Sequence, residues 1–287
     1  MSPRIVLTVA ALTLKESSRR RVLRSLAGLL VILLGLSAWG FSKIPGLDSD
    51  GGALTSGEAR LTASIVLNLV MFGLSLIAAL GTAFLAGPTI SGEVESGVAL
   101  AFLARPVRRV DVLVGKWLGL VAFGAGFVGV AGLAQFLIVR VTVGYWPPSP
   151  VTGLLLLATQ TAVLLTLGLL LSTAISPMAS GVVAVGLFGA TWIAGVVSGI
   201  GAALDNDAVA RVGPVSRMLL PTDGLWRGAM HAFQDPSALS RFGGEAVDGA
   251  FPFLSVAALT PAYLLYVALW LALVLGLAAV AFQRRDV

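Results

Sequence analysis

Six long runs of uncharged, mostly apolar residues constrain the fold of this chain more than any other feature of its sequence. The runs are Ser25–Ser42, Leu61–Ala86, Trp117–Val139, Val151–Ile175, Met178–Leu204 and Leu254–Phe282. Because a helix rises about 1.5 Å per residue, each run crosses or nearly crosses a bilayer core of about 30 Å. We therefore expect an all-α, polytopic integral membrane protein, with residues 1–287 forming a single transmembrane domain.

Composition narrows the chemistry that the chain can carry. Hydrophobic residues make up 57% of it and charged residues 11%, whereas soluble domains have about 45–50% and about 25%. The absence of cysteine excludes disulfides, cysteine–zinc clusters and a cysteine nucleophile. A single histidine, His231, excludes a metal site built from several histidines of one chain. We expect neither catalytic residues nor a bound metal.

The distribution of basic residues predicts how the spans are oriented. Twelve of the 19 Lys and Arg residues lie on the side that holds both termini. Cytoplasmic loops carry such an excess, so we expect both termini in the cytoplasm. We therefore attribute the net charge of +5 to the orientation of the spans across the membrane. We expect these residues to anchor and orient the helices in the lipid bilayer, and we expect no nucleic-acid partner.

Two segments outside the six runs have helical patterns. Residues 3–22 place polar and apolar side chains on opposite faces, which predicts an amphipathic helix at the cytoplasmic interface. A cleaved signal peptide is the alternative, but basic residues stand where such a peptide has its small-residue cleavage site. In the external loop, residues 205–253, we expect an amphipathic helix that begins near Thr222 and lies on the surface.

The segment between the second and third runs, residues 87–112, has the densest polar pattern of the chain, and we call it the elbow. Ser91 suits the N-cap of a short helix whose first turn carries two glutamates. Pro106 ends this helix, because proline disfavours the α conformation in the residue before it. A connector that lies on the membrane with its basic side chains at lipid phosphates is the alternative reading.

The residues of the elbow resemble a known family. The pattern is Ile90-Ser91-x-Glu93-x-Glu95-x-Gly97, then Leu103-x-Arg105-Pro106-Val107-x-Arg109, then Leu113-x-Gly115-Lys116-x-Leu118-Gly119. It is similar to the signature loop of type-2 permeases of ATP-binding-cassette transporters. Thr13-x-Lys15-Glu16 and the terminal Phe282-x-Arg284-Arg285-Asp286-Val287 agree with that family. Arg108 departs from it, since many relatives place Ser or Thr there as a helix cap.

The resemblance implies that the elbow is a coupling helix, which docks into a separate cytoplasmic ATPase. The residues that it assigns to this contact are Ser91, Glu93, Glu95, Gly97, Leu103, Arg105, Pro106, Arg108 and Arg109. Since the chain lacks a G-x-x-x-x-G-K-[ST] loop, ATP and Mg are expected on the partner, with no cofactor on this chain. A second permease chain, identical or related, and export across the plasma membrane of a prokaryote are also implied.

Several residues within the spans have two readings each. Asn68, Gln135 and Gln160 either line a substrate path or form hydrogen bonds between helices. The small-residue pairs 115–119 and 195–199 either pack helices of one chain or form a dimer seam, and we favour packing within the chain. A proline, Pro261, is expected to kink the last span.

Two functions from other classes compete with the permease. An intramembrane enzyme, a protease or a lipid-modifying transferase, needs paired reactive groups near a span. Glu93 and Glu95 are the close carboxylate pair on the cytoplasmic side, but residues two apart diverge by about 200° around a helix. A membrane anchor for an assembly complex would use the same elbow without transport. The cargo of a transporter is not encoded in any motif of the sequence.

Overall fold

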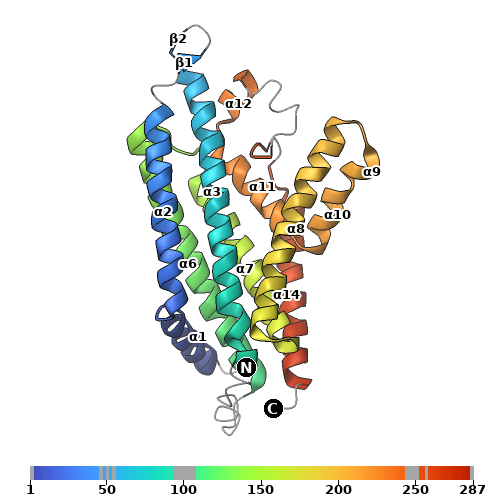
Figure 1. Cartoon of the computed structure of the whole chain (residues 1–287). Helices are drawn as coiled ribbons and strands as arrows, with labels where there is room; N and C mark the ends of the chain where they lie inside the picture. The colour runs from blue at the N-terminus through green and yellow to red at the C-terminus, as the bar shows by residue number, and fades with distance from the viewer. Residues whose placement is uncertain are drawn as a thin grey trace.

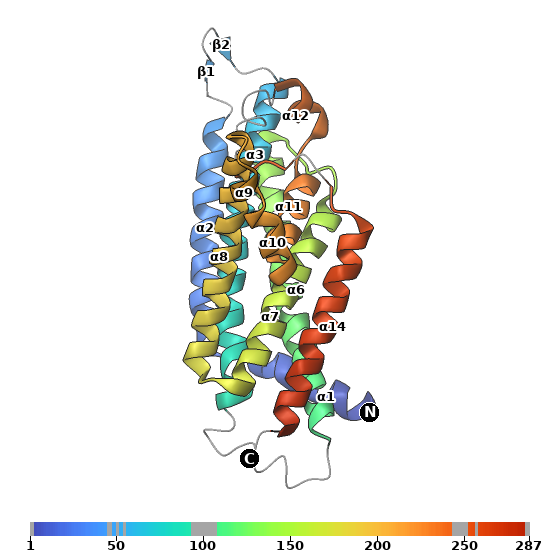
Figure 2. The ribbon, with the colours of Figure 1, turned by 90° about the vertical axis from the view of Figure 1, so that its right-hand side faces the viewer.

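The computed structural model describes residues 3–44, 48–49, 52–53, 56–92, 108–242, 252–255 and 258–284. Figure 1 shows an elongated bundle of long helices that run roughly along one axis. The two ends of the chain lie at the same end of the bundle, as an even number of crossings requires (Figures 1 and 2).

Six helices in the described part of the chain are long and apolar enough to cross a membrane, which confirms the expected all-α membrane fold. They are α2 (Arg21–Lys43), α3 (Ser56–Ala86), α6 (Arg109–Val143), α7 (Pro150–Ala174), α8 (Pro177–Ala203) and α14 (Pro261–Arg284). Two strands of two residues each, β1 (Asp48–Ser49) and β2 (Gly52–Ala53), form an antiparallel pair after α2.

The last span begins later than its apolar run indicates. We expected it over 254–282 with a kink at Pro261, but α14 begins at Pro261. The expected kink is wrong, because a proline at the first helical position has no N–H to lose from the helix and already has a helical φ. Proline also opens α7 and α8, at Pro150 and Pro177.

The N-terminal helix α1 (Pro3–Ser17) lies across the bundle at the end that holds the termini (Figure 2). It ends at Ser17, five residues before the expected limit of 3–22, and a short turn leads into α2. Its backbone touches α6 at two glycines. A Cβ added to Gly115 would lie 2.8 Å from the Val6 carbonyl oxygen, and one on Gly119 would lie 2.6 Å from that of Ala10. This small-residue pair packs two helices of one chain.

The segment after α8 does not stay on the surface. It contains α9 (Asp207–Ala210), α10 (Val212–Leu219), α11 (Thr222–Phe233) and α12 (Pro236–Phe242). In Figures 1 and 2, α10 turns back along α8 and α11 rises again between the long helices. We call α10 and α11 together the hairpin.

Our expectation that the helix beginning near Thr222 lies on the surface is wrong. The α11 side chains Leu225, Trp226 and Phe233 are buried, and the helix carries two glycines, Gly224 and Gly228, away from these side chains. A Cβ at Gly224 would overlap Tyr263 of α14, so α14 packs against the helix at this glycine. The apolar side chains and the two glycines therefore let α11 pack inside the bundle on more than one face.

The main core of the protein surrounds α11. It includes Phe41 of α2, Met71 of α3, Phe136 of α6 and Trp226 of α11, all almost fully buried. The connection between α6 and α7 is tied to it, because the Tyr145 hydroxyl donates to the Phe233 carbonyl at 2.6 Å. Burial, together with the nearby Asp235 carboxylate, raises the pKa of Tyr145 above its ordinary value.

Candidate functional site

The candidate site is the place where the elbow leaves α3 and joins α6. Most of the residues that the family resemblance assigns to it lie outside the described part of the chain: Glu93, Glu95, Gly97, Leu103, Arg105 and Pro106. Ser91, Arg108 and Arg109 are described, and so is the packing beneath them. We call this region the elbow base.

On the α3 side, the chain turns tightly before it enters the elbow. A short 3-10 helix, η2 (Gly87–Thr89), follows α3 directly. The buried Ser91 hydroxyl donates to the Gly87 carbonyl at 2.8 Å, so it ties this residue to the preceding turn. A Cβ on Gly87 would lie 2.5 Å from the Pro177 carbonyl oxygen. The end of α3 therefore sits directly on the start of α8.

On the α6 side, the helix begins at Arg109 without a side-chain cap. The preceding residue, Arg108, is extended with φ −69° and ψ 129°, exposed, and makes no capping hydrogen bond. This agrees with the departure from the family pattern at this position. Its neighbour Arg109 points to the end of α14, where Nη1 donates to the carbonyls of Phe282 and Gln283, both at 3.3 Å. The positive charge of Arg109 is also favourable at this position, because the C-terminal end of α14 is the negative end of its helix dipole.

Lys116, two turns into α6, joins the two sides of the elbow base. Its side chain is 8% exposed, and Nζ donates to the Thr89 carbonyl at 3.0 Å. A buried ammonium is costly unless hydrogen bonds replace its water, and the carbonyls at a helix C-terminus are suitable acceptors. Lys116 belongs to the sequence pattern, but the sequence does not indicate this contact. A lysine near the end of a span usually extends its ammonium group to the membrane–water interface.

An apolar cluster lies beneath these polar contacts. Ile90 from the elbow, Leu113 from α6, Leu169 from α7 and Phe282 from α14 are all buried and pack together. One turn further into the bundle, the Trp117 indole N–H donates to Thr166 Oγ1 of α7 at 2.8 Å. The elbow base therefore involves five of the six long helices, α3, α6, α7, α8 and α14, and is fixed by both polar and apolar interactions.

The three amide residues within the spans each have a partner on another element. Asn68 Nδ2 donates to the Phe253 carbonyl at 2.9 Å. Gln135 Nε2 of α6 donates to Ser37 Oγ of α2 at 2.6 Å, and Ser75 Oγ of α3 donates to Gln160 Oε1 of α7 at 3.2 Å. All three amide residues are buried. They hold helices together here, and their part in a substrate path stays a prediction.

The hairpin contains a charge cluster that sequence reasoning missed. The carboxylate of Asp223, 3% exposed, accepts from Arg217 Nε at 2.8 Å and from Arg227 Nε at 3.1 Å. Arg227 also donates to the Gly195 carbonyl of α8 at 2.7 Å. The sequence predicts these residues in an external loop, where charges are ordinary, so no signal in it indicates that they meet beside α8.

Aromatic side chains of α14 satisfy the carbonyls at the end of α10. Trp270 Nε1 donates to the Leu219 carbonyl at 3.0 Å, and the Tyr266 hydroxyl donates to the Met218 carbonyl. The last carbonyls of any helix have no partner within it. In a membrane, where water is scarce, such groups require partners from the protein. The α14 residues thus stabilise the turn of the hairpin.

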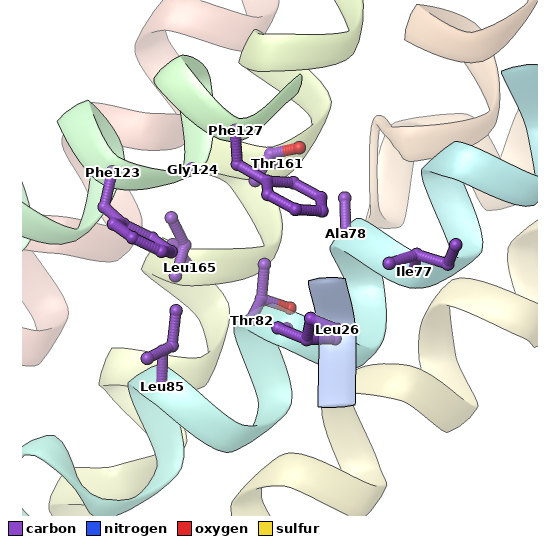
Figure 3. Close-up of a pocket in the computed structure, with 11 residues that line it drawn as sticks. Leu26, Ile77, Ala78, Thr82, Leu85, Phe123, Gly124, Phe127, Thr161 and Leu165 are labelled. Carbon is purple, nitrogen blue, oxygen red and sulfur yellow. The ribbon is translucent and has the colours of Figure 1, made fainter. Parts of the chain in front are cut away.

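The cavity in Figure 3 lies within the bundle and is small. It has a volume of about 20 Å³ and lies between α2, α3, α6 and α7. Its lining is apolar apart from two threonines, Thr82 and Thr161, whose hydroxyls donate to carbonyls of their own helices. Within the described residues, no group of three His, Cys, Asp or Glu side chains could hold a metal ion.

Comparison with known proteins identifies the family. A search of curated protein sequences finds no match to this chain. The family model described as "ABC-2 family transporter protein" matches residues 10–287, which is nearly the whole chain and includes the elbow, its base and all six long helices. The chain therefore belongs to the ABC-2 transporter family.

Proposed function

We propose that this chain is the membrane-spanning permease of an ATP-binding-cassette exporter, driven by a separate ATPase that docks on the elbow. The observation that carries the proposal is the construction of the elbow base. Lys116 binds the α3 end, Arg109 binds the α14 end, and an apolar cluster packs between them. A connector that only crosses the membrane surface needs no such attachment. Membership of the ABC-2 family supports the proposal.

The mechanism that we propose follows from this attachment. A force applied to the elbow acts on α3 and α6 together, because Lys116 and the carbonyl of Thr89 join them. The contact of Gly87 with Pro177 carries the movement to α8, and the Arg109 contacts carry it to α14. Closure of the ATPase would then shift these helices as a rigid body. ATP and Mg are bound by the partner.

The orientation that we propose places the elbow base and both termini in the cytoplasm of a prokaryotic cell. Two observations support it. Figure 1 shows both termini at one end of the bundle, and Arg109 contacts the end of α14 at the same place. Twelve of the 19 basic residues belong to this side, and such an excess is typical of the cytoplasmic segments of membrane proteins.

We also propose that the export pathway forms between two permease chains, identical or related. The cavity of about 20 Å³ in Figure 3 holds about one water and no cargo. Many apolar side chains face outward instead, including Val130 of α6 and Leu265 of α14, which are 71% and 63% exposed. In this proposal, a second permease chain forms the other wall of the export pathway.

Co-purification with the ATPase tests the docking. We expect the wild-type permease to retain the ATPase, and the charge reversals Glu93→Arg and Arg105→Glu, made singly, to lose most of it. Asp207→Arg is the matched control, since Asp207 is exposed in α9, far from the elbow base. Retention of the ATPase by both elbow variants would show that it docks elsewhere.

Reconstitution of the permease with its ATPase in liposomes tests the class of function. A transporter couples ATP hydrolysis to a change in its helices, an intramembrane enzyme turns over its substrate without ATP, and an anchor shows neither. Spin labels on two cytoplasmic helix ends report the change. If the distance between the labels is the same with and without ATP, the assignment of the chain to an exporter is contradicted.

A further inference from the structure

A large groove opens on the outside of the bundle near its cytoplasmic end. It lies between the start of α2, the end of α3 and the first half of α8, and its volume is about 690 Å³. The walls are apolar, with Leu80 and Phe84 on α3 and with Val182 and Val185 on α8. Pockets of about 300–1,000 Å³ hold one small organic molecule or an equivalent length of chain.

One charged residue, Arg20, belongs to the lining of this groove. It stands in the turn between α1 and α2 and is partly buried. It also lines a neighbouring polar hollow, together with Lys15, Glu16 and Arg19. We take Arg20 and this hollow together as the mouth of the groove. Among the described residues, the mouth carries three basic groups and one acid, whereas the rest of the groove lining is apolar.

Glu16, the one acid among the described residues of the mouth, engages Arg20 in part. Arg20 Nη2 donates to Glu16 Oε1 at 2.7 Å, and the Glu16 side chain is 57% exposed. An ion pair this exposed contributes little free energy. A guanidinium has five N–H donors and binds phosphate in a fork-like, bidentate manner. Arg20 therefore has donors left for an anion at the mouth.

We infer that the groove binds an anionic phospholipid of the cytoplasmic leaflet, with an acyl chain along α3 and α8 and the phosphate at Arg20. Basic pockets between membrane helices on the cytoplasmic side bind such headgroups. The inference rests on the proposed orientation of the chain and does not depend on the ATPase. Charge favours this occupant over a second copy of the chain, because the mouth of the groove is itself basic.

Gly186 offers a way to fill the groove without disturbing the bundle. It lines the groove, and a Cβ added there would meet no atom within 4 Å. Gly189, one turn further along α8, is equally open but is not part of the lining. Gly186→Leu and Gly189→Leu are therefore a matched pair, since both add the same side chain to the same helix.

Native mass spectrometry of the purified full-length permease, mixed with equal amounts of phosphatidylglycerol and phosphatidylcholine, tests the inference. We expect the wild type to retain phosphatidylglycerol preferentially. Arg20→Gln should lower its occupancy about fivefold, a loss typical of one basic group near anionic lipid. Gly186→Leu should also lower it, Gly189→Leu should leave it unchanged, and Glu16→Gln should raise it roughly twofold.

Three results would overturn the inference. Equal retention of both lipids would show that the mouth does not recognise charge. Unchanged occupancy in both Arg20→Gln and Gly186→Leu would place the lipid elsewhere. A lipid-free dimer that Gly186→Leu dissociates would show that a second copy covers the groove. None of these results depends on whether the ATPase docks on the elbow, so the two proposals fail separately.

Discussion

Single polar residues near the ends of the long helices determine how those ends are held. Lys116 and Arg109 both donate to carbonyls at the C-terminal ends of other helices. The sequence could predict that both residues lie near the start of the third span. It could not predict which carbonyls they would reach, because those partners are 27 and 173 residues away.

The charge cluster in the hairpin gives a prediction at the same scale. Asp223→Asn removes the carboxylate that two arginines share, so Arg217 and Arg227 lose their acceptor at a partly buried site. Because breaking a buried ion pair leaves a charge without compensation, we expect a loss of roughly 3 kcal/mol of stability. Thermal unfolding in detergent measures it.

Asp207→Asn is the control for this change. Asp207 is exposed in the first turn of α9, so the same substitution there should alter stability by no more than about 0.5 kcal/mol. If Asp223→Asn melts at the wild-type temperature, the cluster does not stabilise the hairpin.

At the scale of elements, the sequence predicted helices better than it predicted their surroundings. The start of α11 near Thr222 was correct, and so was the pattern of its apolar residues. Its burial was missed because an amphipathic pattern fits a membrane surface as well as the interior of a bundle. Only the helices that face α11 decide between these two locations. One of the facing residues, Tyr263 of α14, packs on Gly224 and is 39 residues away from it in the sequence.

The packing of α1 on α6 can be tested through the glycines that allow it. A side chain at Gly119 would collide with the backbone of α1, so Gly119→Leu should displace α1 from the bundle. The chain has no cysteine, and Ser17, at the end of α1, is 2% exposed. A cysteine placed at Ser17 should therefore react slowly with a maleimide in the wild-type background and severalfold faster with Gly119→Leu.

The control for this experiment is Gly126→Leu. Gly126 lies two turns further along α6, where an added Cβ meets nothing within 4 Å. It should leave the labelling of the cysteine at Ser17 slow. Slow labelling with Gly119→Leu as well would mean that α1 is not held by this contact.

At the scale of the whole molecule, hydrophobicity alone determined most of the architecture. Six helices of the expected kind are present in the described chain, because lipid requires long apolar segments whose backbone groups are satisfied internally. The limits of the last span were less predictable. The described residues 258–260 lie outside α14, although they belong to the same apolar run, and apolarity does not distinguish a span from a connecting segment.

The proposed orientation predicts which parts of the molecule face the outside of the cell. A single cysteine at Ser240, exposed in α12, should react with an impermeant maleimide on intact cells. One at Ser18, exposed after α1, should react only after the cells are opened. The reverse pattern would place the termini outside and contradict the positive-inside reading.

The central claim is that the elbow base transmits movement of the ATPase to the helices. The most direct test is the rate of ATP hydrolysis by the complex in liposomes, measured with Lys116→Met and with Lys43→Met. Lys43 is exposed at the far end of α2, so it controls for the same substitution. We predict that Lys116→Met still binds the ATPase but lowers the permease-stimulated rate severalfold, while Lys43→Met matches the wild type. Equal rates for all three proteins would contradict the claim.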